Sequence, residues 1–86
     1  MIQKVSVPAS VTMVFDHKER KVFPKSLFWE GKAYQIKRVG LHHFFRQGQT
    51  LYHVFSVETE TLSFRLVLNC DNLFWTIEEI SDGEAN

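Results

Sequence analysis

Apolar and polar side chains alternate one by one along most of residues 27–80. In an extended strand successive side chains point to opposite faces, so this period gives each segment one apolar face and one polar face. Apolar residues at the i, i+3, i+4, i+7 spacing of an amphipathic helix do not recur over any long stretch. The chain also contains 9 Val, 4 Ile, 5 Thr and 12 aromatic residues but only 3 Ala, which favours strands over helices. We therefore expect an all-β protein.

Polar turns divide the alternating stretch into strands whose apolar faces match. The expected turns are residues 30–33, 47–49, 58–61 and 69–72. Folding at these turns sets Trp29 opposite Tyr34, His43 opposite His53, Phe55 opposite Phe64, and Leu66 opposite Trp75. All of these pairs fall on one face, and a slip of one residue would turn the apolar side of a strand outward. The predicted inner core is Trp29, Tyr34, Ile36, Leu41, His43, Leu51, His53, Phe55, Phe64, Leu66, Trp75 and Ile77.

These registers predict an antiparallel meander of five to six strands. The apolar parity shifts by one between Ile36 and Val39, which indicates a β-bulge or bend near Lys37 and Arg38 and favours a sheet curled into a small barrel or roll. A length of 86 residues suits a single β domain, 1–86. Residues 1–24 are expected to add less regular N-terminal strands, and residues 81–86 to form a frayed tail.

The second face of the predicted sheet is too apolar for a solvated face and too polar for a dry core. Either residues 11–23 cover this face, or it is a contact surface. In the second case the candidate binding surface consists of His42, Phe44, Arg46, Tyr52 and Arg65, in which aromatic rings interleave with cations. Proteins use this combination to stack the bases and neutralise the phosphates of single strands.

The formal charge is zero, yet it is unevenly distributed along the chain. Residues 1–46 carry a net charge of +6 and residues 47–86 a net charge of −6. Either the basic half forms a surface for nucleic acid or an acidic partner, or neighbouring strands mix the two signs. Opposite charges on the two halves would also suit an antiparallel homodimer.

Cysteine usage and hydropathy point to a cytoplasmic protein. The sequence contains one cysteine, Cys70, and therefore no internal disulfide, which suits a reducing compartment. No apolar run approaches the roughly 18 residues that cross a membrane as a helix, and the first residues lack a signal-peptide core. We expect no membrane contact.

Four segments of the chain carry a family resemblance. They read GLHHFFR at residues 40–46, LYHVFSV at 51–57, FRLVLN at 64–69 and WTIEEISDG at 75–83. Together they resemble an uncharacterised family of short all-β proteins of candidate-phylum bacteria, over about residues 22–83. The resemblance implies a small intracellular bacterial protein, and brings with it no activity, ligand or site residue.

Two histidines, His43 and His53, are expected to oppose each other on the apolar face. Cβ atoms of directly paired residues lie about 5 Å apart, so the two imidazoles can share a hydrogen bond or a metal ion. No third ligand accompanies them, and we expect a structural histidine pair with no metal or other cofactor. Catalysis is not expected, because the sequence has no nucleophile–base–acid set and no glycine-rich phosphate loop.

These features together predict a small non-enzymatic binding or interaction module. Its partner is expected to be another protein or a second copy of the chain. The alternative is a module that binds single-stranded nucleic acid, RNA above all, through the aromatic and basic face.

Overall fold

The computed structural model describes residues 1–82, which form a single antiparallel sheet of seven strands. The strands are β1 (Ile2–Asp16), β2 (Lys21–Trp29), β3 (Lys32–Gln35), β4 (Arg38–Gln47), β5 (Thr50–Glu58), β6 (Ser63–Asn69) and β7 (Trp75–Ser81). The all-β class is confirmed, since residues 1–82 contain no helix. The strand count was underestimated, because the N-terminal segment supplies the 15-residue β1 and the first part of β2.

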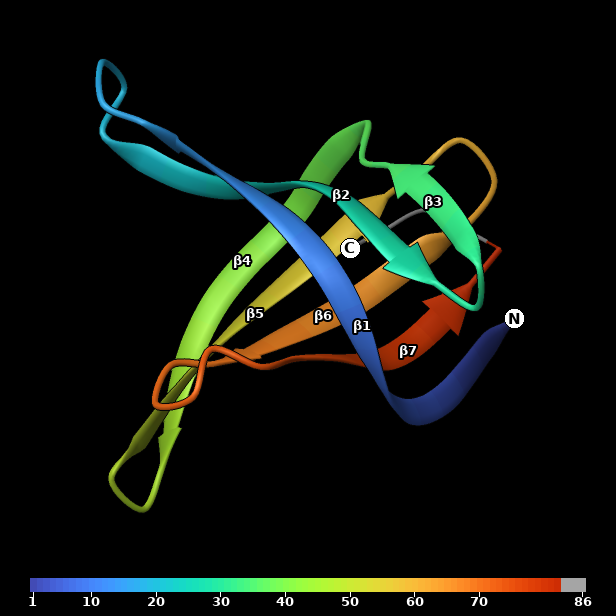
Figure 1. Ribbon diagram of the computed structural model, residues 1–86. Coiled ribbons are helices and arrows are strands. Elements are labelled where there is room, and N and C mark those ends of the chain that lie inside the picture. Colours follow the sequence, from blue (N-terminus) through green and yellow to red (C-terminus); the bar gives the residue numbers. More distant parts are fainter. Residues whose placement is uncertain (83–86) are drawn as a thin grey trace.

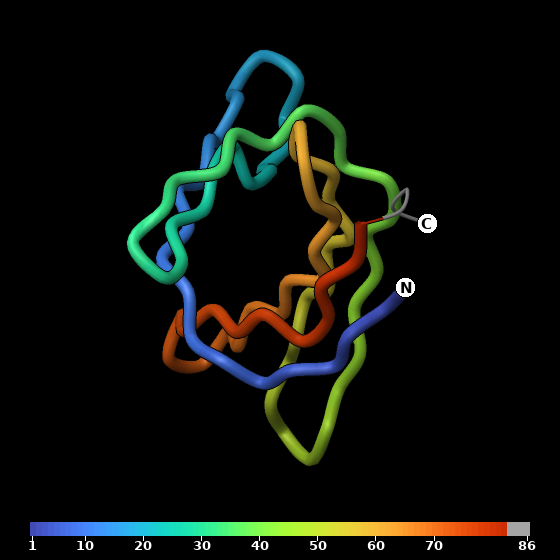
Figure 2. Tube along the Cα trace, turned by 90° about the vertical axis from the view of Figure 1, so that its right-hand side faces the viewer, coloured from blue at the N-terminus to red at the C-terminus, as the bar shows by residue number. Residues whose placement is uncertain are grey.

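The order of the strands in the sheet is β3-β2-β1-β7-β6-β5-β4 (Figure 1). Strands β4 to β7 form the expected meander, and β2 and β3 form a hairpin. The long strand β1 joins these two parts, because its first half pairs with β7 and its second half with β2. Register shifts within both halves of β1 mark bulges, and bulges increase strand bending and twist. The sheet therefore curls round on itself, as the view in Figure 2 shows.

The curled sheet does not close into a barrel, because no strand ladder joins β2 or β3 to β4. Instead, the connection between β3 and β4 crosses from one edge of the sheet to the other. Its two residues form backbone hydrogen bonds on opposite sides: Ile36 N–H donates to the Lys25 carbonyl at 2.9 Å, and Lys37 N–H to the Glu58 carbonyl at 2.7 Å. The expected bend near Lys37 is confirmed as a break between two strands.

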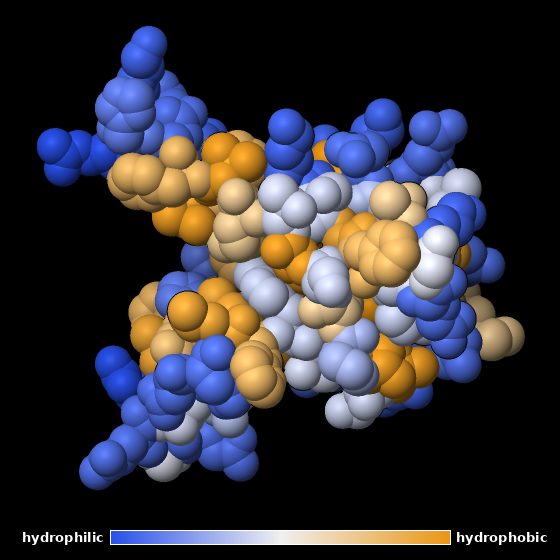
Figure 3. Space-filling view, in the orientation of Figure 1, coloured by the Kyte–Doolittle hydropathy of each residue, from blue (hydrophilic) through white to orange (hydrophobic). Residues whose placement is uncertain are grey.

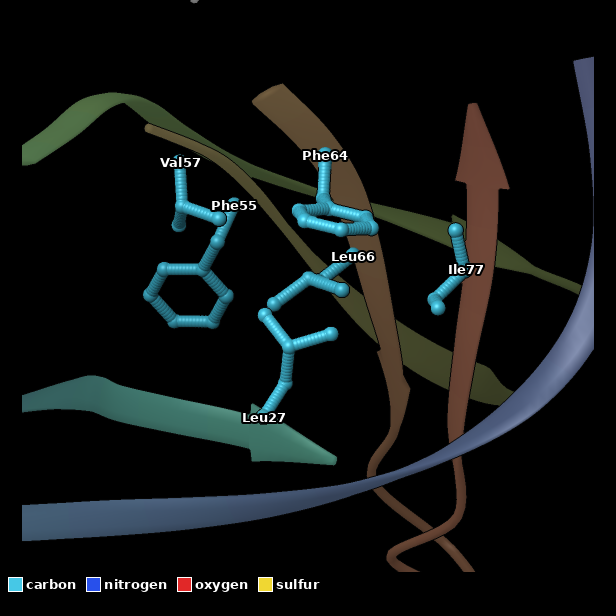
Figure 4. Close-up of a cluster of buried hydrophobic side chains, with 6 residues drawn as sticks. All are labelled: Leu27, Phe55, Val57, Phe64, Leu66 and Ile77. Carbon is cyan, nitrogen blue, oxygen red and sulfur yellow. The ribbon is translucent and has the colours of Figure 1, made fainter. Parts of the chain in front are cut away.

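Six side chains form the core on the inner face of the curl: Leu27, Phe55, Val57, Phe64, Leu66 and Ile77 (Figure 4). Four of them belong to the predicted core, and the predicted Trp29, Tyr34, Ile36 and Trp75 pack against the cluster half-buried. The rings of Trp29 and Tyr34 meet the Phe64 ring edge-on, with centroids 6.2 and 5.0 Å away. The prediction was wrong for Leu41, which is 47% exposed.

The faces of β5, β6 and β7 were predicted correctly, although their registers differ from those expected. The structure pairs Phe55 with Leu66 and Leu66 with Ile77, which keeps each residue on its predicted face. The register difference between β5 and β6 has a local cause in the turn that joins them. Here the Thr59 hydroxyl donates to the Leu62 carbonyl and accepts from the Leu62 N–H, which moves the four-residue turn one position along the chain.

The predicted register of β4 was wrong by one residue beyond Val39. Val39 lies opposite Val57 as expected, but the register shifts at Gly40, and the hairpin closes with a two-residue turn at Gly48 and Gln49. His43 consequently lies opposite Val54 instead of His53, and on the outer face of the sheet. A bulge reverses the faces of every residue that follows it, so the faces of residues 41–46 are opposite to those predicted.

Residues 11–23 do not cover the outer face, because β1 and β2 extend the sheet and turn Val11 and Met13 toward the inner core. The expected tail also begins later than residue 81. Ser81 belongs to β7, and the Asp82 carboxylate accepts a hydrogen bond from the Met1 amino group at 2.9 Å. The remainder of that tail, residues 83–86, lies outside the described residues.

Replacing Leu66 by Ala should destabilise the protein by about 2–5 kcal/mol, because the Leu66 side chain is fully buried and its loss leaves a cavity. The same change at Leu41 should cost less than about 0.5 kcal/mol. Urea unfolding followed by tryptophan fluorescence compares the two. If Leu66→Ala does not fold, Ile77→Val offers a milder version with an expected cost of about 0.5–1.5 kcal/mol. Equal effects at Leu66 and Leu41 would contradict the core assignment.

Candidate functional site

A cleft of about 450 Å³ lies where the sheet fails to close, between the start of β2 and the start of β4. We call it the basic cleft, and its lining residues are Lys21, Val22, Phe23, Pro24, Lys25, Ile36, Lys37, Arg38, Val39, His42 and Phe55. Its volume falls in the range of small-molecule sites, which is about 300–1,000 Å³. The basic cleft is therefore large enough for a group the size of one nucleotide.

Among the described residues, four cations and no carboxylate contribute to the lining of the basic cleft. Arg38 forms an ion pair with Glu58 of β5. The other ion pairs within residues 1–82 are Met1 with Asp82 and Arg65 with Glu78, so Lys21, Lys25 and Lys37 have no carboxylate partner there. The Lys21 ammonium lies 5.9 Å from the centroid of the Phe23 ring. Three uncompensated lysines on the wall of one cleft favour an anionic ligand.

The charge asymmetry of the sequence persists in the folded sheet. Strands β1 to β4 belong to the basic half of the chain, and β5 to β7 to the acidic half. In the sheet order the acidic strands lie together in the middle, with the basic strands on either side. The curl of the sheet (Figure 2) places the start of β2 and the start of β4 on the two sides of the basic cleft. The sequence allowed two arrangements: a basic surface, or neighbouring strands of opposite charge. Strands of opposite charge are neighbours only at the β1–β7 and β4–β5 boundaries among the described residues.

A row of neighbouring rings, stacked at His42, His53 and Phe55 and tilted by 45° between His53 and Phe44, runs along the inner face of β4 and β5 from the basic cleft. The His42 ring stacks on Phe55 with centroids 4.2 Å apart and planes inclined by only 6°. His42 and His53 are 5.0 Å apart, and Phe44 and His53 5.7 Å. We call these four residues the aromatic row. Phe55 is buried in the core, whereas Phe44 at the other end is 66% exposed.

The structural histidine pair exists, but its members are His42 and His53. His42 Nε2 lies 2.8 Å from His53 Nδ1, within hydrogen-bond distance. One ring must donate and the other accept, so at least one of the facing nitrogens is unprotonated. Desolvation of the ring against its neighbours, followed by the nearby His53 and His43 imidazoles, lowers the pKa of His42. Within residues 1–82 no cluster of three or more His, Cys, Asp or Glu side chains is placed to hold a metal ion.

The five residues of the predicted binding surface do not share one face. His42 and Phe44 belong to the inner aromatic row. Tyr52 and Arg65 lie on the outer face, where Tyr52 stacks on Phe45 at 5.0 Å and Arg65 pairs with Glu78 at 3.0 Å. Arg46 is exposed and pairs with Leu51 near the end of β4. The predicted surface was therefore wrong as a continuous patch, and the Gly40 bulge is the reason.

Sequence reasoning did not single out Lys21, Lys25 and Lys37. The excess of positive charge in residues 1–46 was the available signal. Alternation along a strand does not reveal which edges of a curled sheet meet, so this signal could not be resolved into a site.

Exposed apolar side chains surround the open end of the cleft, which we call the mouth. Figure 3 shows the molecule hollowed between the β1–β2 hairpin and the β4–β5 hairpin, with hydrophobic atoms on both sides. Phe15 and Val22 are exposed on the first hairpin, Phe44 on the second, and Leu73 and Phe74 in the β6–β7 turn. An apolar concentration of this kind on a surface marks a site of interaction.

No known protein identifies the cleft: no family model, curated protein or solved structure matches the chain. Over residues 1–82, no helix has the length and apolar character that spanning a membrane requires.

Acidification below pH 6.5 should destabilise the protein through His42. Because the pKa of His42 is lowered in the folded state, the unfolded chain takes up a proton first. The contribution of neutral His42 to the free energy of unfolding is complete above pH 6.5, and it is lost progressively as the pH falls below that value. The urea midpoint should therefore be lower at pH 5.5 than at pH 7.5. The variant His42→Phe retains a ring on Phe55 and should show a smaller pH dependence. The matched control is His17→Gln in the exposed β1–β2 turn, and its urea midpoint should change with pH as much as that of the wild type. If the midpoint of His42→Phe changed with pH as much as that of the wild type, His42 would not be the group responsible.

Proposed function

We propose that this chain is a non-enzymatic binding module that holds single-stranded nucleic acid, RNA above all, in the basic cleft. The observation that carries the proposal is the combination of three uncompensated lysines and Arg38 with the stacked rings of His42 and Phe55 in one lining. Cations neutralise the phosphates of a single strand, and aromatic rings provide stacking surfaces for its unpaired bases.

The aromatic row favours a single strand over a duplex. In a duplex the bases are already paired and stacked on one another, and the rings of the row would have no exposed base face to contact. In a single strand the bases are free, and each base stacked on an aromatic ring contributes about 1–3 kcal/mol. Phe44 and His53 extend the stacking surface from the cleft toward the mouth. The ligand that fits both parts is a short single strand with its phosphates against the lysines.

The free edge of β4 supports a second candidate function, which is binding of a protein strand. Nine of the ten residues of β4 pair with β5 on one side, and within residues 1–82 no strand pairs with the other side. An unpaired edge of this length is a template for a strand from another protein or from a second copy of the chain. Sedimentation at increasing concentration tests the second copy. A monomer up to about 1 mM would leave only other proteins as strand donors.

Binding of a fluorescein-labelled 12-nucleotide RNA should be measured by anisotropy between 50 and 200 mM salt. We expect Lys25→Gln/Lys37→Gln to weaken binding and to reduce the slope of log K against log[salt] by about 1.4, or about 0.7 for each lost phosphate contact. The matched control is Lys4→Gln/Lys32→Gln. It changes the net charge by the same amount but affects lysines that do not line the cleft. An equal loss of affinity in both double variants would show that RNA is attracted non-specifically by the net charge. Absence of binding by the wild type at 50 mM salt would refute the proposal.

Phe44→Ala should weaken binding of the same RNA by about 5- to 150-fold, which corresponds to the loss of stacking on one base. Phe28→Ala is the control, because Phe28 is exposed to a comparable extent (51%) but lies on the outer face of β2. The salt slope should not change in either variant, since neither removes a cation. An equal affinity of Phe44→Ala and the wild type would exclude the aromatic row from the binding site.

A further inference from the structure

The basic cleft is closed at one end by the protein backbone. The connection from β3 to β4 crosses there, and it is tied to both sides of the gap. Ile36 N–H bonds to Lys25 of β2, and Lys37 N–H bonds to Glu58 of β5. Since main-chain hydrogen bonds hold the crossing on both sides, it forms a fixed wall at this end of the cleft.

The other end of the cleft is open. From the crossing, β2 and β4 lead away to the β1–β2 and β4–β5 hairpins, and these hairpins stand apart at the mouth (Figures 1 and 3). The aromatic row follows the same direction, from buried Phe55 and its β4 partner His42 to exposed Phe44, two residues farther along β4 toward the mouth. A linear ligand that enters through the mouth therefore reaches the crossing with its end.

The cations gather at the closed end. Two of the three lysines that have no carboxylate partner within residues 1–82 lie there: Lys37 belongs to the crossing itself, and the backbone carbonyl of Lys25 accepts the hydrogen bond from Ile36. Arg38 follows the crossing directly, and its charge is paired with Glu58. Lys21 lies four residues away along β2, about 13 Å toward the mouth at the usual rise of a strand. The densest positive charge thus lies where the end of a ligand would be. A terminal phosphate monoester carries about −1.5 to −2 charges at pH 7, whereas each internal phosphate carries only one.

We propose that the basic cleft receives the phosphorylated end of a single strand, and not an internal segment. This inference rests on the proposed function and specifies its ligand as a terminal phosphomonoester followed by unpaired bases. The phosphomonoester lies against Lys25 and Lys37, the terminal base contacts the ring of His42, which Phe55 supports from behind, and the following nucleotides leave past Phe44.

Competition between four unlabelled RNAs of one 12-nucleotide sequence tests the proposal. The probe carries its fluorophore on an internal base, and the competitors are a 5′-phosphorylated strand, a 3′-phosphorylated strand, a strand with two hydroxyl ends and a covalently closed circle. We expect one phosphorylated strand to bind at least tenfold more tightly than the hydroxyl-ended strand, and the circle to bind most weakly. The better of the two phosphorylated strands identifies the polarity of the bound chain.

Two results separate the failure of this inference from the failure of the proposed function. Equal binding of all four competitors would overturn end recognition and leave single-strand binding in place. Absence of binding by all four at 50 mM salt would refute the proposed function, and the inference with it.

Two lysine variants provide a readout that a purely structural role would not change. Lys37→Gln should reduce the ratio of affinities for phosphorylated and hydroxyl-ended strands toward one. Lys21→Gln should weaken binding of both strands by the same factor and leave the ratio of their affinities unchanged, because Lys21 is remote from the crossing. Amide NMR spectra that match the wild type establish that each variant is folded. An equal reduction of the ratio in both variants would overturn the placement of the phosphate at the closed end.

Discussion

The structure depends on the double pairing of β1. One half of this 15-residue strand completes the meander through β7, and the other half supports the β2–β3 hairpin. The hairpin would otherwise be an isolated pair of strands, which is at best marginally stable in water. Because bulges in both ladders of β1 bend the sheet, one within β1 itself and one at Lys25 of β2, the hairpin is placed over the inner face of the meander, and Leu27 meets Phe64 and Leu66 in a single core. Burial of these apolar surfaces holds the curl in place.

The same curl determines where a ligand can bind. A fully closed barrel would have no free edges, whereas a flat sheet would hold its two edges far apart. In this protein the edges approach each other without pairing, and the crossing at Ile36 and Lys37 is hydrogen-bonded to β2 on one side and to β5 on the other. The gap that remains is lined by main-chain edges, by basic side chains and by the rings of Phe23, His42 and Phe55. The stacking of His42 on Phe55 shows this continuity, because one ring belongs to the cleft and the other to the core.

Patterns within single strands predicted the faces of those strands well, whereas the order of the strands in the sheet could not be predicted from such patterns. Alternation predicted the faces of β5, β6 and β7 even where the turns shift the register, because a shift of two residues preserves the face. It failed in β4, where Gly40 inserts one residue without any change in the apolar pattern that would reveal it. His42 and Phe44 were recognised as candidate site residues but were placed on the wrong face. The lysines of the cleft depend on the neighbours of β1 in the sheet, and alternation within a strand carries no information on that order.

The pairing of β1 with β7 also has a consequence for how the chain folds. It sets Ile2 opposite Ser81, so this ladder joins residues from nearly opposite ends of the sequence. The entropy of closing so large a loop must be overcome before the contact contributes any stability, and folds rich in such contacts reach the native state in milliseconds to seconds instead of microseconds. The β4–β7 meander can form from local turns, but until β1 arrives its apolar inner face is uncovered and its β7 edge is open. Association of newly made chains through that edge competes with the arrival of β1, and dilute conditions therefore favour correct folding.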